Sequence, residues 1–329
     1  MNISTKFAGL ILKSPVIVSS SGLTGTVAKF REFEENGAGA IVLKSLFEEE
    51  IHFEYDQIVK EAGNDSYSQE DLDYFDLKIR QDNINKYISL IQNAKKEGSI
   101  PVIASINCSS LHEWTNFTQK IEQAGADALE LNIFTLPSDI SKDARDIEDT
   151  YFKIIEKVKK NLGIPLVIKM SSWFTNLSAM IKNVSETGID GLVLFNRFFM
   201  PDIDIRAKRI TSAGVFSSPA DLTLPLRWIA LSAGRVSCPL AASTGVHDGE
   251  SLVKMILVGA DAVEIASTLY KNGSRQIREM NEFLAAYMKD ENADSLQDIK
   301  GILSQKNVKN PAIFERVQFM KYFSDRTDN

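Results

Sequence analysis

Short runs of apolar residues alternate along the chain with longer segments in which apolar and polar residues are mixed. The apolar runs are continuous, which is typical of parallel strands buried on both faces. They predict eight strands, at Val16–Ser19, Ala40–Lys44, Val102–Ser105, Ala128–Asn132, Leu166–Lys169, Gly191–Leu194, Leu240–Ala242 and Ala262–Ala266. The segments between them predict helices at Val27–Asn36, Asn83–Glu97, Leu111–Ala124, Asp146–Asn161, Leu177–Glu186, Pro219–Ser232 and Gly249–Val258.

A glycine-containing phrase recurs where a predicted helix gives way to the next strand. It reads Asn36-Gly37-Ala38-Gly39-Ala40, Ala124-Gly125-Ala126-Asp127-Ala128, Thr187-Gly188-Ile189-Asp190-Gly191 and Val258-Gly259-Ala260-Asp261-Ala262. A glycine at this place supplies the left-handed residue that ends a helix. The repetition predicts an α/β fold, and eight units favour a closed (β/α)₈ TIM barrel over a doubly wound open sheet, which stays an alternative.

Two segments interrupt this rhythm, and both follow a predicted strand. Residues 45–82 follow the second strand and residues 195–218 follow the sixth. Because barrel active sites are built at the carboxyl ends of the strands, we expect both insertions to form lids or walls of a site. Terminal helices are expected from about residue 274, and no linker divides the chain, so residues 1–329 are expected to form a single barrel domain.

The composition excludes several classes of protein. A net charge of −7 argues against nucleic-acid binding, which needs a basic face to neutralise phosphates. No stretch approaches the roughly 20 apolar residues of a membrane helix, and the first residues lack the features of a signal peptide. Two cysteines and three histidines, without metal-ligand spacing, indicate that no metal is bound. We therefore expect a cytosolic protein that binds neither nucleic acid nor membrane.

Polar side chains occur at the carboxyl ends of four predicted strands. Lys44, Asn132 and Lys169 end the second, fourth and fifth strands, and Asn196 follows the sixth. In a barrel these side chains would converge on one mouth. A single lysine there could equally reach solvent or pair with a structural carboxylate, but the four residues together favour a ligand site.

Small and hydroxyl-bearing residues follow the seventh and eighth strands, in Ser243-Thr244-Gly245 and Ala266-Ser267-Thr268. The loops after these two strands are the common phosphate site of barrels. The sequence therefore predicts a phosphate-bearing ligand at this side of the mouth.

Several segments, in order over about residues 5–285, resemble motifs of the dihydroorotate dehydrogenase family, nearest to its cytosolic class. They are Ser14-Pro15-Val16 with Ser19-Ser20-Ser21-Gly22, the segment Gly37–Ser45, Glu130-Leu131-Asn132-Ile133, Pro165–Lys169, and Ser243–Val246 with Gly259–Ile265. The resemblance implies a barrel that binds FMN and oxidises dihydroorotate to orotate in pyrimidine biosynthesis, with hydride transfer to the flavin.

The resemblance also implies roles for individual residues. FMN contacts would come from Ser20, Ser21, Gly22, Lys44, Ser45, Asn107, Asn132, Lys169, Asn196, Thr244, Gly245, Ala266 and Ser267. A fixed ammonium at Lys169, near the flavin's pyrimidine edge, would favour the anionic reduced flavin. The pyrimidine-like substrate would contact Lys44, Asn64, Asn132, Asn196 and Arg197. A homodimer is the expected assembly and fumarate the expected acceptor, and any iron–sulfur relay would lie on another chain.

The chain departs from the family where the catalytic base is expected. The family's cytosolic class has a cysteine three residues after the strand-four asparagine, and here that position is Thr135, or Leu136 if the following proline is aligned. Thr135 and Lys44 are therefore the candidate catalytic residues, although a threonine hydroxyl is a weak base. The loop after strand two also differs, Arg197 replaces a serine, and Thr244 and Ala266 replace two glycines.

These departures leave three alternatives open. The enzyme acts on another pyrimidine-like substrate, or the chain binds FMN and has lost its catalytic base. In the third alternative the barrel is an aldolase or isomerase with Lys44 or Lys169 as a Schiff-base amine.

Overall fold

Eight parallel strands close into a barrel in the computed structural model, which describes residues 1–47, 50, 53–57, 69–108, 114–133, 135–198 and 200–315. The strands are β3 (Val16–Val18), β4 (Ala40–Val42), β6 (Val102–Cys108), β7 (Ala128–Ile133), β8 (Leu166–Met170), β9 (Gly191–Leu194), β12 (Leu240–Ser243) and β13 (Ala262–Ile265). The barrel closes because β13 pairs with β3 and β4 pairs with β6. The eight predicted strands and the (β/α)₈ fold are confirmed, and the open sheet is excluded.

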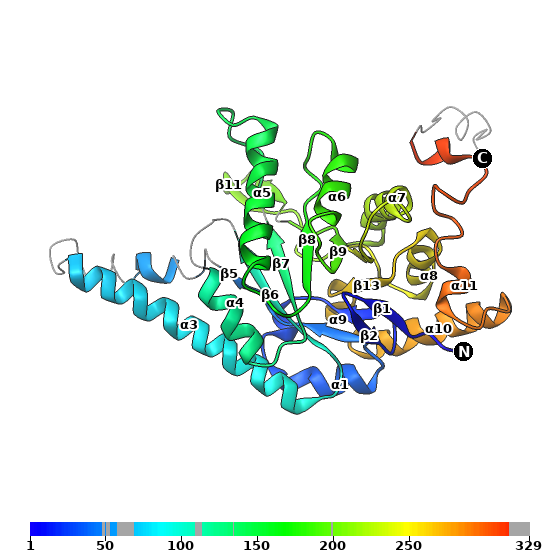
Figure 1. Cartoon of the computed structure of the whole chain (residues 1–329), viewed down its shortest axis with the longest axis horizontal. Helices are drawn as coiled ribbons and strands as arrows, with labels where there is room; N and C mark the ends of the chain where they lie inside the picture. Colours follow the sequence, from blue (N-terminus) through cyan, green and yellow to red (C-terminus); the bar gives the residue numbers. More distant parts are fainter. Residues whose placement is uncertain are drawn as a thin grey trace.

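Helices surround the barrel (Figure 1). They are α1 (Phe30–Glu35), α3 (Gln69–Glu97), α4 (Trp114–Gln123), α5 (Ala144–Lys159), α6 (Leu177–Ser185), α7 (Thr223–Ser232), α8 (Gly249–Val258), α9 (Ser267–Asn272), α10 (Arg275–Asp290) and α11 (Leu296–Ile299). Short 3₁₀ turns are η1 (Gly22–Thr24), η2 (Val27–Lys29), η3 (Pro219–Leu222) and η4 (Pro311–Phe314). None of the helices in the described part of the chain is long and apolar enough to cross a membrane.

The recurring glycine phrase has two structural roles. The glycine at the second position of each phrase has positive φ, at Gly37, Gly125, Gly188 and Gly259. In three phrases the aspartate accepts a hydrogen bond from the first backbone N–H of the preceding strand, Asp127 from Val102, Asp190 from Leu166 and Asp261 from Leu240. The phrase therefore ends a helix and also fixes where the adjacent strand begins.

Helix α3 is longer than predicted. It begins at Gln69 rather than at Asn83, so residues 69–82 are helical and do not form the loop expected there. No glycine or proline occurs between Gln69 and Glu97, and nothing in the sequence stops the helix from starting early. In Figure 1 this helix extends away from the barrel. Much of the remaining insertion after the second strand lies outside the described residues.

The barrel interior is filled by an apolar layer and a polar layer. Because side chains alternate along a strand, every second residue faces inward. The apolar layer includes Ile17, Ile103, Ala128, Val167 and Ala262. Two residues further along the same five strands, the inward positions are polar: Ser19, Ser105, Glu130, Lys169 and Glu264. The polar layer therefore lies toward the carboxyl ends of the strands.

A hairpin that was not predicted covers the amino ends of the barrel. It consists of β1 (Thr5–Phe7) and β2 (Leu10–Leu12), and Phe7, Ala8 and Leu12 pack within the apolar layer. The packing is tight, because a Cβ added to Gly191 at the start of β9 would lie 2.9 Å from the Phe7 ring. The hairpin therefore seals the end of the barrel opposite the polar layer.

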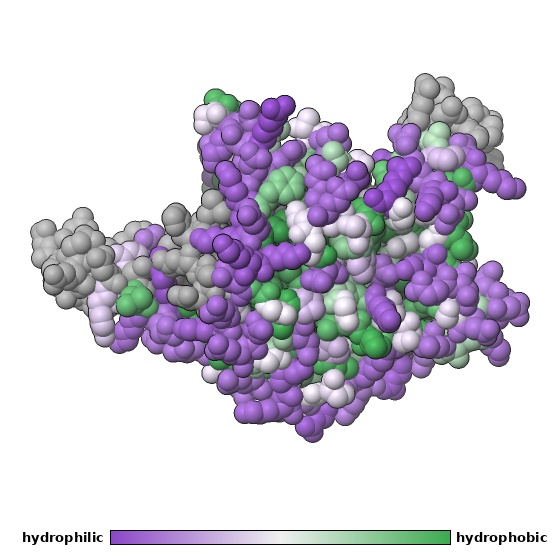
Figure 2. Space-filling view, viewed as in Figure 1, coloured by the Kyte–Doolittle hydropathy of each residue, from purple (hydrophilic) through white to green (hydrophobic). Residues whose placement is uncertain are grey.

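The insertion after the sixth barrel strand forms a second hairpin. Its strands are β10 (Pro201–Asp204) and β11 (Arg209–Ser212), and the cross-strand pair Ile203 and Ile210 is exposed. After this hairpin, residues 213–218 return to the barrel mouth. The face of the molecule seen in Figure 2 is largely hydrophilic, with apolar residues showing mainly between the helices.

Candidate active site

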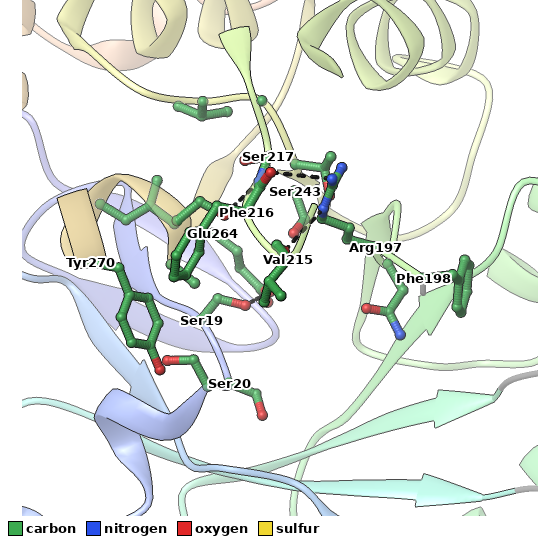
Figure 3. Close-up of a pocket in the computed structure, with 18 of the residues that line it drawn as sticks. Ser19, Ser20, Arg197, Phe198, Val215, Phe216, Ser217, Ser243, Glu264 and Tyr270 are labelled. Carbon is green, nitrogen blue, oxygen red and sulfur yellow. Dashed lines mark hydrogen bonds between the residues drawn. The ribbon is translucent and has the colours of Figure 1, made fainter. Parts of the chain in front are cut away.

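A cavity of about 580 Å³ lies at the carboxyl ends of the strands, where the polar layer is. Its wall is formed by Ser19–Gly22 after β3, Lys169 of β8, Asn196–Phe198 after β9, Ser243–Val246 after β12, Glu264–Ser267 around the end of β13, residues 212 and 214–217 of the insertion, and Tyr270. In Figure 3, Tyr270 and Ser20 lie on one side of the cavity and Arg197 and Phe198 on the other. The volume is in the range of about 300–1,000 Å³ that is typical of cofactor sites.

Most of the predicted cofactor contacts meet at this cavity. Those on its wall are Ser20, Ser21, Gly22, Lys169, Asn196, Thr244, Gly245, Ala266 and Ser267, and the predicted substrate contact Arg197 joins them. These residues come from five different strand ends. The insertion after the sixth strand contributes to the wall, as expected.

Ser45 and Asn132 lie behind the wall and are connected to it by hydrogen bonds. The hydroxyls of Ser20 and Ser45 are 3.0 Å apart, and those of Ser45 and Ser105 are 2.7 Å apart. Asn132 donates from Nδ2 to the Ser105 hydroxyl at 3.0 Å. The network continues inward, because the same amide nitrogen lies 3.4 Å from Glu130 Oε1.

Several buried side-chain oxygens at this end of the barrel have no hydrogen-bond partner among the described residues, and three of them belong to residues on β6 and β7. They are Asn107 Oδ1, Glu130 Oε2 and Asn132 Oδ1. A buried polar atom without a partner is costly, so such atoms are usually paired by a ligand or by water when the protein is functional. The orphaned oxygens therefore fit a site that receives a polar ligand.

Lys44, Thr135 and Asn107 are also absent from the wall of the cavity. Lys44 is half-exposed, and its ammonium lies 3.4 Å from the carboxylate of Glu50. Thr135 is half-buried in the loop after β7. Asn64 lies outside the described residues. Asn107, at the end of β6, is half-buried and pairs in register with Asn132.

The ammonium of Lys169 lies between two buried carboxyl groups. Its Nζ is 2.5 Å from Glu264 Oε2 and 3.5 Å from Glu130 Oε1, and it donates to the Ser19 hydroxyl at 3.0 Å. The exposed fractions of the three charged side chains are 5% for Lys169 and 1% for each glutamate. Ser19 also donates to Glu264 Oε2, at 2.9 Å. Glu264 therefore receives two donors on one oxygen, whereas Glu130 Oε2 receives none.

This environment moves the pKa values of the two glutamates in opposite directions. Burial raises the pKa of Glu130 well above its ordinary value, and the neighbouring Glu264 carboxylate adds to the rise. Burial also acts to raise the pKa of Glu264, but Lys169 and the hydrogen bonds outweigh it and lower that pKa. Burial opposes the charge of Lys169, but the two carboxyls raise its pKa overall. The surroundings therefore favour the charged forms of Lys169 and Glu264 and the protonated form of Glu130.

Arg197 holds the insertion against the barrel. Its guanidinium donates to the carbonyl oxygens of Gly214 and Phe216 and lies 3.3 Å from the carboxylate of Asp221. Val215 O accepts from Nε of the same side chain at 3.4 Å. The arginine therefore positions one wall of the cavity.

Ser217 and His247 form a buried pair beside the loops after β12 and β13. The Ser217 hydroxyl lies 2.9 Å from Nε2 of His247, and the Ser217 N–H donates to the Ser267 hydroxyl. Burial and the nearby Lys271 lower the pKa of His247, which favours its neutral form. The pair therefore links the insertion after β9 to the loop after β12.

The sequence predictions missed several residues of the site. They are Ser19, Glu130, Ser217, His247, Glu264 and Tyr270. The two glutamates could have been found, because each stands two residues beyond a small apolar inward position, Ala128 in one strand and Ala262 in the other. Ser217 and Tyr270 depend on how an insertion and a short helix fold, for which the sequence offers no local signal.

Comparison with known proteins gives a consistent result. The sequence profile described as dihydroorotate dehydrogenase matches residues 78–288. The chain is 27% identical over 311 residues to the catalytic subunit of dihydroorotate dehydrogenase B (NAD⁺) from Thermoplasma acidophilum, covering 92% of this chain and 98% of that protein. It is 26% identical over 309 residues to a putative dihydroorotate dehydrogenase A (fumarate) from Aeropyrum pernix, covering 91% and 96%.

A solved structure supports the fold. The crystal structure of the Eimeria tenella dihydroorotate dehydrogenase in complex with ferulenol superposes with a TM-score of 0.64 over 92% of this chain and 88% of that one, at 16% identity. This likeness concerns the barrel alone. Because the family profile spans more than half of the sequence, the chain belongs to the dihydroorotate dehydrogenase family.

Proposed function

We propose that this chain is an FMN-dependent oxidoreductase that oxidises dihydroorotate to orotate in pyrimidine biosynthesis. The observation that carries the proposal is the convergence of residues from five strand ends on one cavity of about 580 Å³. Membership of the dihydroorotate dehydrogenase family agrees with it.

The residues of the cavity fit FMN at both of its ends. Ser243–Val246 and Ala266–Ser267 offer small side chains, hydroxyls and backbone N–H groups for the phosphate. Ser20–Gly22, Asn196 and Lys169 would hold the ring, and Ser45, Asn107 and Asn132 lie behind them with two unpaired amide oxygens. When bound, FMN supplies the hydride acceptor, while the protein binds, orients and excludes water.

The oxidation also requires a group that accepts a proton from the substrate. In this proposal Thr135 takes that role, assisted by the Lys44 ammonium, and Asn64, Asn132, Asn196 and Arg197 contact the pyrimidine ring. Lys44 is held near Glu50 rather than on the cavity wall, so substrate binding would have to draw it inward.

Two observations favour a second candidate function, an FMN protein that acts on another pyrimidine-like ring or has lost its base. Thr135 is absent from the wall of the cavity. The Arg197 guanidinium is engaged by Gly214, Phe216 and Asp221 and is therefore not free for a substrate carboxylate. In this candidate the cofactor site stays intact while the substrate differs.

Anaerobic absorbance spectroscopy of the purified protein separates these possibilities. Under the main proposal the protein is yellow, and its flavin band bleaches when dihydroorotate is added. A yellow protein that does not bleach with dihydroorotate contradicts the substrate and moves the function to the second candidate. A colourless protein that takes up no FMN contradicts the cofactor, and trapping by borohydride with a carbonyl substrate would then indicate Schiff-base chemistry.

The electron acceptor and the oligomeric state are tested separately. Relatives of the chain carry names that specify either NAD⁺ or fumarate. We propose fumarate for the isolated chain, and reoxidation of the reduced protein by fumarate, but not by NAD⁺, is the expected result. We further propose a homodimer, which sedimentation of the purified protein measures directly.

A further inference from the structure

In the polar layer of the barrel, two carboxyl groups lie next to the ammonium group of Lys169. Lys169 is 2.5 Å from Glu264 and 3.5 Å from Glu130, and all three are almost completely buried. Two ionised carboxylates beside a single ammonium would leave an uncompensated buried negative charge, which is strongly unfavourable in a low dielectric. The group is most stable with one proton on its carboxyls and a net charge of zero.

The geometry shows which carboxyl carries that proton. Glu264 Oε2 accepts from both Lys169 and Ser19, as a carboxylate would. Glu130 Oε1 has long contacts with Asn132 at 3.4 Å and Lys169 at 3.5 Å, and its carboxyl also interacts with that of Glu264. In the described structure no donor reaches its Oε2. Tyr87 is the further titratable group whose charge is coupled to Glu130, and burial keeps it neutral.

Two members of this group line the cavity and the third lies behind them. Lys169 and Glu264 are on the wall, and Glu130 lies under it. In Figure 3, Glu264 is seen at the cavity beside Ser19. A negative charge that develops in the cavity therefore meets a neutral group rather than a free ammonium, and a neutral group stabilises that charge less.

We propose that Glu130, Lys169 and Glu264 act as one neutral unit that shares a single carboxyl proton, and that this unit sets the reduction potential of the flavin in the cavity. The flavin part of this inference rests on the proposed function. The unit buffers its own charge: when one carboxyl is replaced by an amide, the remaining one ionises and still balances Lys169. Only the loss of both carboxyls leaves a positive charge facing the flavin.

The first test is infrared spectroscopy of the protein, which does not depend on bound FMN. Wild-type protein at neutral pH should give a carboxylic-acid band that shifts in D₂O and is absent from Glu130→Gln. The same band should also vanish in Glu264→Gln, because Glu130 then ionises, although its side chain is unchanged. Persistence of the band in Glu264→Gln, or its absence from the wild type, overturns the shared proton. Glu250→Gln, in an exposed pair with Lys254, serves as the control and should leave the carboxylic-acid band unchanged.

The second test is the midpoint potential of bound FMN, measured at pH 6, where an unpaired buried lysine retains its proton more fully. In Glu130→Gln and in Glu264→Gln, the ratio of the affinities for oxidised and reduced FMN should stay within a few fold of the wild-type ratio. The double variant should favour the reduced form at least about tenfold, a rise of about 30 mV for a two-electron couple. The charge buffering is overturned if the midpoint potential rises by about 30 mV in either single variant, or if it does not rise in the double variant.

The two tests also separate this inference from the proposed function. If the wild type takes up no FMN, the proposed function and the flavin part of the inference both fail. The infrared spectra then still test whether Glu130 and Glu264 share a proton, because they do not depend on FMN.

Discussion

The guanidinium of Arg197 lies 3.3 Å from the carboxylate of Asp221, and this pair joins the loop after β9 to the 3₁₀ turn η3. The same guanidinium donates to the carbonyl oxygens of Gly214 and Phe216. One side chain therefore fixes both ends of the segment that forms a wall of the cavity.

Replacing Arg197 with methionine should weaken FMN binding at least about tenfold, because hydrogen bonds to a charged group contribute roughly 1.5–3 kcal/mol each and the wall loses several. Titration of FMN fluorescence measures the change. Arg209→Met is the matched control, since Arg209 lies 3.7 Å from Asp204 on the exposed hairpin and should not affect binding. An unchanged affinity for FMN in the Arg197 variant would show that Arg197 is not needed to position this wall of the cavity.

Gly245→Ala should destabilise the fold by at least about 2 kcal/mol. Gly245 has a φ of +84°, and an added Cβ would lie 2.2 Å from the backbone nitrogen of Leu222, which cannot move alone. Gly273→Ala is the control, because Gly273 has a φ of +76° but no atom within 4 Å of the added Cβ. Urea unfolding of both variants measures the difference. Equal losses of unfolding free energy in the two variants would mean that the positive φ, and not the steric clash, causes the destabilisation.

Lys169→Met should cost about 3–5 kcal/mol of unfolding free energy at neutral pH, because it leaves buried carboxyls without their cation. Lys254→Met, which breaks the exposed pair with Glu250, should cost less than about 1 kcal/mol. In the lysine variant, the pKa of Glu264 is no longer held down. Its destabilisation should therefore shrink as the pH falls below about 4.3, where the carboxyl is protonated in the unfolded chain too. A loss that is independent of pH contradicts this account.

Glu130→Gln should flatten the pH dependence of stability. The pKa of Glu130 is raised in the folded protein, so above the unfolded value of about 4.3 the native state holds a proton that the unfolded chain has released. Stability of the wild type therefore falls with rising pH, by up to about 1.4 kcal/mol per unit from this group, until Glu130 itself ionises. The glutamine variant lacks this slope. Thermal unfolding from pH 5 to pH 8 gives both curves, and parallel curves would mean that Glu130 is already ionised.

Thr135→Ala should lower the turnover of dihydroorotate about 100-fold if Thr135 accepts the substrate proton, since a general base contributes about 10²–10⁴-fold. Thr135→Cys should restore turnover as the pH approaches the thiol pKa of about 8.5. Stopped-flow bleaching of the flavin measures the step directly. Leu136→Ala, at the neighbouring exposed position, is the control. Similar rates in Thr135→Ala and wild type would remove Thr135 from the mechanism.

The barrel itself could be predicted from the sequence because its signals are local. Each strand is a short apolar run, and each glycine phrase, such as Val258–Ala262, marks the turn that precedes one. The start of α3 at Gln69 was missed because its first turns are acidic and polar, with weak periodicity. The β1–β2 hairpin was missed because Phe7 finds its neighbours only when the whole barrel has closed over it.

The site was predictable only in part, for the same reason. Lys169 and Asn132 end recognisable strands, whereas the two glutamates that decide the charge of Lys169 stand inside strands read as uniformly buried. Arg197 was expected to meet substrate because, by the resemblance to the family, it occupies the position of a serine after the sixth strand. Its partners at Gly214 and Phe216 depend on how the insertion folds back, which no short pattern in the sequence encodes.

The hairpin that seals the barrel also has a consequence for synthesis of the chain. Phe7 is synthesised before all eight barrel strands, yet it packs in one cluster with Ala241 and Ala262. These two alanines lie more than two hundred residues further along the chain, and contacts of such long sequence separation form slowly. Until the last strand is made, the β1–β2 hairpin cannot complete this packing and its apolar side chains stay exposed, which is a state that chaperones protect from aggregation.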